Sequence, residues 1–153
     1  MAKKKYLKRL IDEEIRKYEM DSPDCHSSEW KEGNKKDSDR CNTQSAGECS
    51  SAEGISTAAN GFASHAEGCN SVANGECSHA EGRNTMANGI ASHSEGEETE
   101  AGGIASHSEG AQTTALSLQS HAEGFSTTAS GISSHAEGAE TIASGLESHA
   151  EGA

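Results

Sequence analysis

A histidine and a glutamate stand two residues apart in a five-residue motif that recurs along this chain. The motif reads SHAEG at 64–68, 78–82, 120–124, 134–138 and 148–152, and SHSEG at 92–96 and 106–110. An imidazole and a carboxylate at this spacing could exchange protons as an acid–base pair, or bind one metal ion. Catalysis is disfavoured by the repetition, because an active site is usually a single concave site rather than a flat, replicated face.

Three chemical readings of the motif differ in what the His/Glu pair contacts. In the structural reading, which we prefer, His and Glu form charge-assisted hydrogen bonds between chains or between stacked turns. In the metal reading, imidazole suits Zn, Ni or Cu and carboxylate suits Ca or Mg. A Ser–His–Glu triad is not expected, because alternation along a strand puts Ser64 on the opposite face from His65. We therefore predict no enzymatic activity, no catalytic residue, no bound metal and no cofactor.

A strict period of fourteen residues organises the chain from about residue 37. A Glu–Gly dipeptide ends at Gly54 and another ends at every fourteenth residue up to Gly152, with no insertion between them. Within one unit, small residues alternate at 64–68 and again at 71–75, which is the period of a strand. Each turn should therefore consist of two short strands joined by two tight turns, with Gly and Asn at the corners and the small residues inside. Two helices do not fit into fourteen residues.

Stacking of the units places equivalent residues in columns, and the outward columns are either variable or constant. One outward column varies freely: Ala58, Val72, Met86, Glu100, Thr114, Thr128 and Ile142. Another variable outward column is mostly apolar: Phe62, Glu76, Ile90, Ile104, Leu118, Ile132 and Leu146. By contrast, the His and Glu columns do not vary, and a constant outward face indicates a constant environment, of which the simplest is a copy of the same rod. The predicted trimer-interface ladder is His65, Glu67, His79, Glu81, His93, Glu95, His107, Glu109, His121, Glu123, His135, Glu137, His149 and Glu151.

Composition and charge exclude several classes of partner. Hydrophobic residues make up 31% of the chain and aromatic residues 3%, too few for an ordinary globular core. Residues 1–36 carry a net charge of +2 and residues 37–153 a net charge of −15. Such an acidic body would be repelled by nucleic acids and by anionic membranes. The sequence also contains no apolar run long enough for a transmembrane helix, so we expect neither nucleic-acid binding nor membrane insertion.

The segment before the repeats, residues 1–36, has a different composition. Residues 1–20 have an apolar stripe at helical spacing and are predicted to form a short amphipathic helix, without the apolar core of a signal peptide. Residues 21–36 are polar and rich in turn formers, which is typical of a linker, and residues 37–153 form the repeat domain of about eight turns.

The five cysteines are interpreted as small buried thiols rather than a disulfide framework.

The fourteen-residue unit resembles the head repeats of trimeric autotransporter adhesins, which are called YadA-like or haemagglutinin-type repeats. The matching residues are Ser64-His65-Ala66-Glu67-Gly68 and Ala73-Asn74-Gly75, repeated through Gly152. This resemblance implies an all-β, left-handed parallel β-roll, or solenoid, of 14-residue turns in a homotrimer. His and Glu stand where the family has Val and Ile, the residues that pack between chains. The SHAEG variant also resembles repeats in tail spikes of phages of Gram-positive bacteria.

The resemblance and the columns together lead to a functional expectation. We expect a non-enzymatic, trimeric head or stalk of a cell-surface appendage or virion fibre, which presents its variable columns to a host-surface or matrix receptor. Two alternatives stay open: a fragment of a phage tail spike that lacks its C-terminal domain, and a metal-binding repeat scaffold that uses the His/Glu columns.

Overall fold

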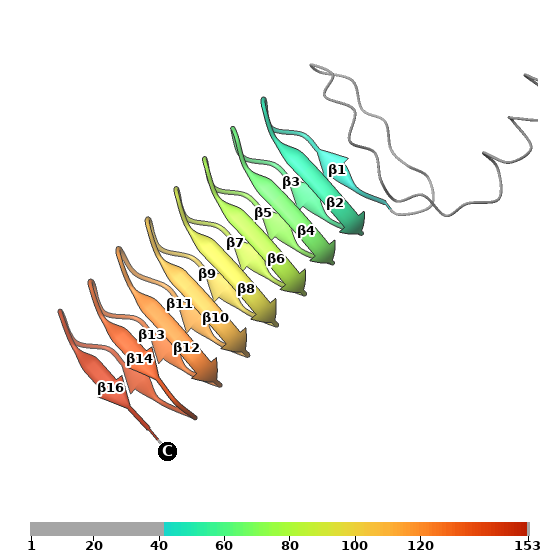
Figure 1. Cartoon of the computed structure of the whole chain (residues 1–153). Helices are drawn as coiled ribbons and strands as arrows, with labels where there is room; N and C mark the ends of the chain where they lie inside the picture. Colours follow the sequence, from blue (N-terminus) through green and yellow to red (C-terminus); the bar gives the residue numbers. More distant parts are fainter. Residues whose placement is uncertain (1–41, 153) are drawn as a thin grey trace, which may run out of the picture.

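The computed structural model describes residues 42–152, and in this range the chain is an all-β parallel solenoid of about eight turns (Figure 1). Each turn contributes one long strand and one short strand, as predicted. The long strands are β2 (Ser51–Ile55), β4 (His65–Cys69), β6 (His79–Arg83), β8 (His93–Glu97), β10 (His107–Ala111), β12 (His121–Phe125), β14 (His135–Glu137) and β16 (His149–Glu151). The short strands are β1 (Gln44–Ser45), β3 (Ala58–Ala59), β5 (Val72–Ala73), β7 (Met86–Ala87), β9 (Glu100–Ala101), β11 (Thr114–Ala115), β13 (Thr128–Ala129) and β15 (Ile142–Ala143).

The strands form two parallel sheets of eight strands each, one of long strands and one of short strands. In both sheets a residue pairs with the residue fourteen positions later, so His107 lies beside His121 and Ala115 beside Ala129. This constant register turns the sequence period into straight columns of like residues. Between residues 42 and 152 we find no helix, and hence none with the length and apolar character needed to cross a membrane.

The interior between the two sheets is filled by small side chains. Ala66 from the long sheet and Ala73 from the short sheet are fully buried, and Ser64 is 2% exposed. The Ser64 hydroxyl donates a 2.8 Å hydrogen bond to the carbonyl oxygen of Gly61, so its burial leaves no unpaired group. In an SHSEG turn the additional serine is also satisfied, because the hydroxyl oxygens of Ser108 and Thr113 lie 2.7 Å apart. The prediction of inward Ser and Ala residues is confirmed.

The predicted inward position is wrong for the glycine that ends each SHAEG motif. Gly68 is exposed rather than buried, and its φ angle is +99°. A Cβ atom at this position would collide with the carbonyl oxygen of Gly82 in the next turn. Glycine is therefore required here by the left-handed backbone and the close approach of neighbouring turns, and not by lack of space inside the coil.

The corners of the coil use left-handed backbone at residues that are not glycine. Asn70 and Asn84 have φ angles of 58°, and Asn70 donates a 3.1 Å side-chain hydrogen bond to Asn84, as expected for Asn at a corner. The opposite corner has φ angles of 51° at Ala63 and 54° at Cys77, where the alternation of small residues alone did not predict a left-handed conformation.

The described cysteines are not buried, which corrects the expectation of small buried thiols. Cys49 and Cys77 are exposed at a corner, Cys69 is half-buried at the outer end of β4, and all three are free thiols. Corner side chains point away from the narrow interior, which has room only for Ala, Ser and Thr. The predicted helix at 1–20, the predicted linker at 21–36 and the start of the repeat domain at 37–41 lie outside the described residues.

Candidate functional site

The invariant His and Glu residues lie on the outer face of the long sheet, which we call the long-sheet face. Each histidine begins a long strand and each glutamate follows two residues later, while the residue between them points inward. The side chain of His107 is 36% exposed and that of Glu109 is 33% exposed, so both columns are half-buried by their own neighbours. The face therefore consists of two parallel rows of ionisable groups.

The histidine rings stack along the whole length of the long sheet. Centroids of adjacent rings are 4.7–5.0 Å apart, and the angle between adjacent ring planes ranges from 1° to 13°. This spacing is the distance between paired strands, so the register alone places the rings face to face. All seven predicted histidines, from His65 to His149, belong to this one stack.

Each histidine lies diagonally against the glutamate of the preceding turn. The distance from His93 Nε2 to Glu81 Oε1 is 3.4 Å, and the corresponding distances at His65, His79, His107, His121 and His135 are 3.7–4.0 Å. Only His149, in the last turn described, reaches hydrogen-bond distance, at 3.2 Å from Glu137 Oε1. Contacts between stacked turns are therefore present, but from His65 to His135 they are not the predicted hydrogen bonds. His93, His107 and His121 also lie 3.9 Å from the glutamate of their own motif. Whether the same columns face sister chains stays a prediction.

One member of the ladder was missed by the sequence reasoning. Glu53, in β2, lies 3.9 Å from His65 Nε2 and occupies the glutamate column of a turn that has Ser51 in place of histidine. The signal that could have revealed it was the Glu–Gly pair that closes at Gly54, in step with all the later pairs.

Burial and stacking lower the pKa values of three histidines in the stack, so these three are neutral more readily than an isolated imidazole. The pKa of His107 is lowered first by desolvation, and then by repulsion from the stacked rings of His121 and His93. The pKa values of His79 and His121 are lowered for the same reasons. These shifts argue against protonated histidine at neutral pH, and they leave the imidazole lone pair available.

Three glutamates in the middle of the column, Glu95, Glu109 and Glu123, share a proton. Hydrogen bonds with Glu123 and Glu95 raise the pKa of Glu109 to about 7. The same bonds to Glu109 lower the pKa values of Glu95 and Glu123. Near neutral pH a protonated Glu109 therefore relieves the repulsion that a column of ionised carboxylates at the strand spacing would produce.

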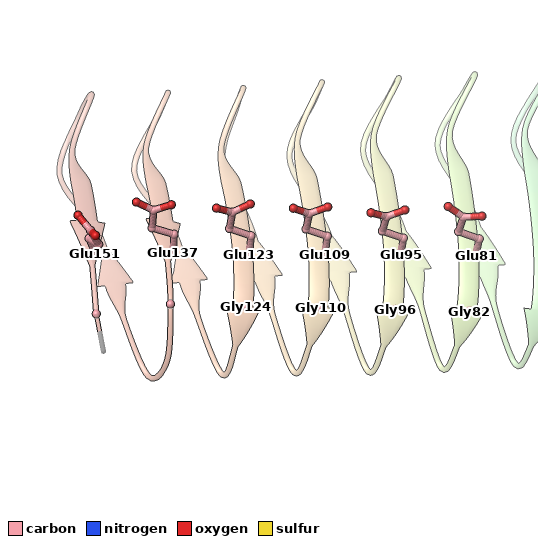
Figure 2. A pocket seen from close by; sticks show the side chains of 12 residues that line it. Glu81, Gly82, Glu95, Gly96, Glu109, Gly110, Glu123, Gly124, Glu137 and Glu151 are labelled. Atoms are coloured by element: carbon pink, nitrogen blue, oxygen red, sulfur yellow. The ribbon is translucent and has the colours of Figure 1, made fainter.

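The glutamates and the glycines that follow them line a shallow groove of about 860 Å³ along the long sheet. Figure 2 shows the carboxylates from Glu81 to Glu151 in one row on successive strands. The groove runs parallel to the stack of turns, and each turn from Glu81 to Gly152 contributes the same two residues to it. A groove of this shape suits a long partner or a row of ions better than one small substrate.

Six histidine nitrogens in the described range have no hydrogen-bond partner although they are screened from solvent. They are the Nε2 atoms of His65, His79, His93, His107, His121 and His135. Buried polar atoms normally have a partner, so this row requires an explanation within the function of the face. The inward Ser64 provides none, because its hydroxyl is bonded to Gly61 inside the coil and cannot complete a triad with His65.

Acidification is expected to destabilise the rod through the histidine stack, and Glu109 is expected to oppose this. At His79, His107 and His121 the lowered pKa means that the folded chain binds fewer protons than the unfolded chain, so the free energy of unfolding falls as the pH drops through about 6.5. Glu109, with its pKa raised to about 7, contributes stability below its ordinary pKa that is lost as the pH rises to about 7.

The Glu109→Gln variant separates the two contributions. We expect the loss of melting temperature between about pH 8 and about pH 5.5 to be larger in this variant than in the parent chain, because only the histidines still titrate there. Thermal unfolding followed by circular dichroism at both pH values measures the difference. An equal or smaller loss in the variant would contradict the proton-sharing role of Glu109.

Searches against models of known protein families and against curated protein sequences found no match to this chain. Functional inference therefore starts from the fold and from the residues of the long-sheet face.

Proposed function

We propose that this chain is a non-enzymatic structural rod, a homotrimeric YadA-like head or stalk of a cell-surface appendage or virion fibre. Three chains would pack with their long-sheet faces toward a common axis, so that the ladder from His65/Glu67 to His149/Glu151 lies between them. The regular stack of about eight turns supports this proposal, because a solenoid of constant register is a rigid spacer.

The observation that carries the proposal is the contrast between a thin interior and an apolar exterior. The interior holds only Ala, Ser and Thr side chains, which bury little apolar area. The large apolar residues lie outside instead, and six of the eleven exposed ones within residues 42–152, between 43% and 70% exposed, form the column Phe62, Ile90, Ile104, Leu118, Ile132 and Leu146. This column lies in the turn that leads into each histidine, so packing of chains through the long-sheet face would also cover apolar surface.

The outer face of the short sheet is suited to the attachment role. Its column changes from Val72 to Met86, Glu100 and Thr114 while the backbone stays the same. A trimer packed through the long-sheet face would leave this variable column accessible to a host-surface or matrix receptor. Repeat proteins usually bind their partners through variable surface residues on a constant backbone scaffold.

A phage tail-spike fragment is the second candidate, and the motif itself favours it. His and Glu occupy the positions where adhesin head repeats have Val and Ile, and the SHAEG variant resembles tail-spike repeats. Both candidates need the same trimeric rod, so they differ in the structure that carries the rod and not in the role of these residues.

The mass of the chain in solution tests the proposed trimer. We expect light scattering coupled to size exclusion to give three times the chain mass of 15.8 kDa. The double substitution Glu95→Lys/Glu109→Lys on the long-sheet face should reduce this mass to that of one chain, because lysine cannot share a proton along the column as Glu109 does, so permanent like charges would meet at the threefold axis.

A variant on the other sheet controls for folding and for most of the charge change, since it alters the net charge by +3 where the first variant alters it by +4. Glu100→Lys/Thr114→Lys changes the variable column of the short sheet and should leave the trimer intact. A monomeric parent chain would contradict the proposal, and so would dissociation of both variants to the same extent.

A further inference from the structure

Pairs of adjacent histidines on the long-sheet face have ring nitrogens that make no hydrogen bond within the described chain. The Nε2 atoms of His79 and His93 are both screened from solvent and lack a hydrogen-bond partner. The same is true of His121 and His135. A screened nitrogen with a free lone pair is a defect in a structural hydrogen-bond network, whereas it is what a metal ion requires of a ligand.

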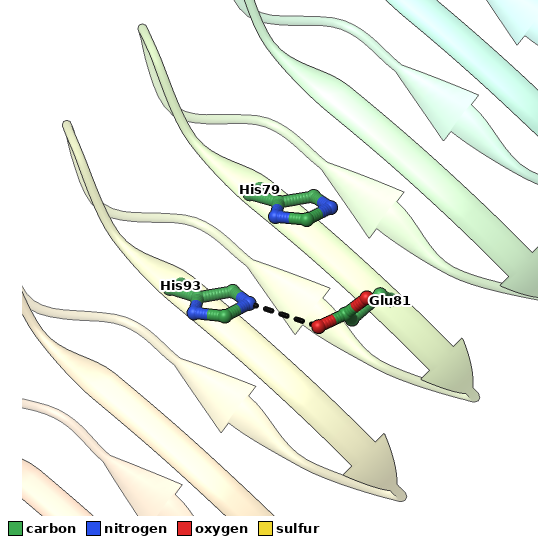
Figure 3. Close-up of side chains that lie close together, drawn as sticks. All are labelled: His79, Glu81 and His93. Carbon is green, nitrogen blue, oxygen red and sulfur yellow. Dashed lines mark ion pairs between the residues drawn. The ribbon is translucent and has the colours of Figure 1, made fainter.

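The geometry around these nitrogens brings a carboxylate to each pair. The rings of His79 and His93 stack with a centroid distance of 4.9 Å and an interplanar angle of 2°. Glu81 Oε1 lies 3.4 Å from His93 Nε2, and Figure 3 shows this contact beside the edge of both rings. One donor atom from each of the three residues lies within 4.8 Å of the other two, and the same holds for His121, Glu123 and His135.

We propose that His79, Glu81 and His93 form one zinc-type metal site, that His121, Glu123 and His135 form a second, and that each binds one divalent transition-metal ion through two imidazole nitrogens and one carboxylate oxygen. Two imidazoles and a carboxylate are a donor set for Zn²⁺, which has metal–ligand distances of about 2.0–2.2 Å. Donors around such an ion lie about 3–4 Å apart, and the three donor atoms here already lie within 4.8 Å of one another, so binding requires them to converge by about 1 Å.

The column cannot bind an ion at every turn, because each Nε2 has one lone pair. Occupation of the first site uses His79 and His93, and occupation of the second uses His121 and His135. His107 then lies between the two sites, where the remaining cluster offers one imidazole with Glu95 and Glu109. This cluster is richer in carboxylate and is the weaker transition-metal site. The site geometry lies within one chain and does not depend on the proposed trimer.

Zinc titration of the tag-free full chain tests the assignment, with the metal content measured after dialysis. We expect two Zn²⁺ per chain in the parent, one in His93→Ser and none in His93→Ser/His135→Ser, which follows from the two clusters that have two histidines each. Serine is a suitable replacement because Ser51 occupies the histidine column in β2 without disturbing the strand pairing. Circular dichroism in EDTA verifies that the variants retain the fold.

His107→Ser is the matched control, since it breaks the same ring stack outside both sites and should leave two Zn²⁺ per chain. With Co²⁺ in place of Zn²⁺, the parent should also show the visible absorption of a low-coordinate site, and His93→Ser should lose about half of it. Absence of Zn²⁺ binding in the parent would overturn the proposal, as would equal losses in His93→Ser and His107→Ser. Light scattering in EDTA reports the trimer separately, so failure of this proposal is distinguishable from failure of the proposed assembly.

Discussion

Replacement of Gly110 by alanine is expected to destabilise the solenoid strongly, although it adds a single methyl group. Gly110 has a φ angle of +102°, a conformation in which an L-residue is strained by about 1–3 kcal/mol. A Cβ atom there would also collide with the carbonyl oxygen of Gly124, which belongs to the backbone and cannot rotate away. We expect a total cost of about 3 kcal/mol or more, and a fall in melting temperature of about 10 °C.

Gly102→Ala is the control for this experiment. Gly102 has no left-handed φ angle, and a Cβ atom there would have Leu116 Cδ2 as its nearest neighbour, at an ordinary distance of 3.5 Å. Its melting temperature should therefore stay within about 2 °C of the parent value. Thermal unfolding by circular dichroism compares the two variants, and equal melting temperatures would show that the Glu–Gly backbone is not under the constraint described.

The other glycine column contains a side chain in one turn, although a Cβ atom at Gly103 would collide with the carbonyl oxygen of Ser117. That column contains Gly89, Gly103 and Gly131, but Ser117 in the turn between the last two. The Ser117 hydroxyl donates to the carbonyl oxygen of Ser130, so this corner accommodates a Cβ atom. The column of Gly110 has glycine in every turn from Gly54 to Gly152.

Ala115→Met is expected to have the second large effect, through overpacking of the interior. Ala115 is fully buried between the sheets, where every neighbouring column consists of Ala, Ser or Thr. Insertion of larger side chains into a well-packed core usually costs about 1–3 kcal/mol. Here the interior is only one small side chain deep on each sheet, so the sheets themselves must separate. We expect the free energy of unfolding to fall by about 3 kcal/mol, the upper end of this range, and the melting temperature to fall by about 10 °C.

Thr114→Met makes the matched comparison one residue earlier on the same strand. Thr114 points outward, and its column already contains Met86 two turns before it. The variant should unfold within about 2 °C of the parent chain, because the added atoms remain on the surface. Similar losses in both variants would indicate that Ala115 does not lie in a tightly filled interior.

Much of the fold could be predicted because a repeat of constant period leaves few alternatives. The spacing from Gly54 to Gly152 predicted the register, and the register predicted the columns. Alternation at 64–68 then predicted which side chains point inward, and Ser64 and Ala66 are indeed buried. Gly68 shows the limit of this reasoning. A small residue at the end of a strand can be required by a left-handed backbone as well as by a narrow interior.

The sequence by itself determined the repeat length, the two-strand turn, the small interior and the existence of constant His and Glu columns, because periods of two and fourteen are properties of residue order. Only the tertiary structure decided how these columns meet. Stacked turns place each imidazole near the carboxylate twelve residues earlier, as His93 lies against Glu81, while His107 and His121 lie about equally near the carboxylate of their own motif. They also leave a row of histidine Nε2 atoms screened and unpartnered. Distances between turns depend on strand spacing and side-chain direction, which the order of residues along one turn does not contain.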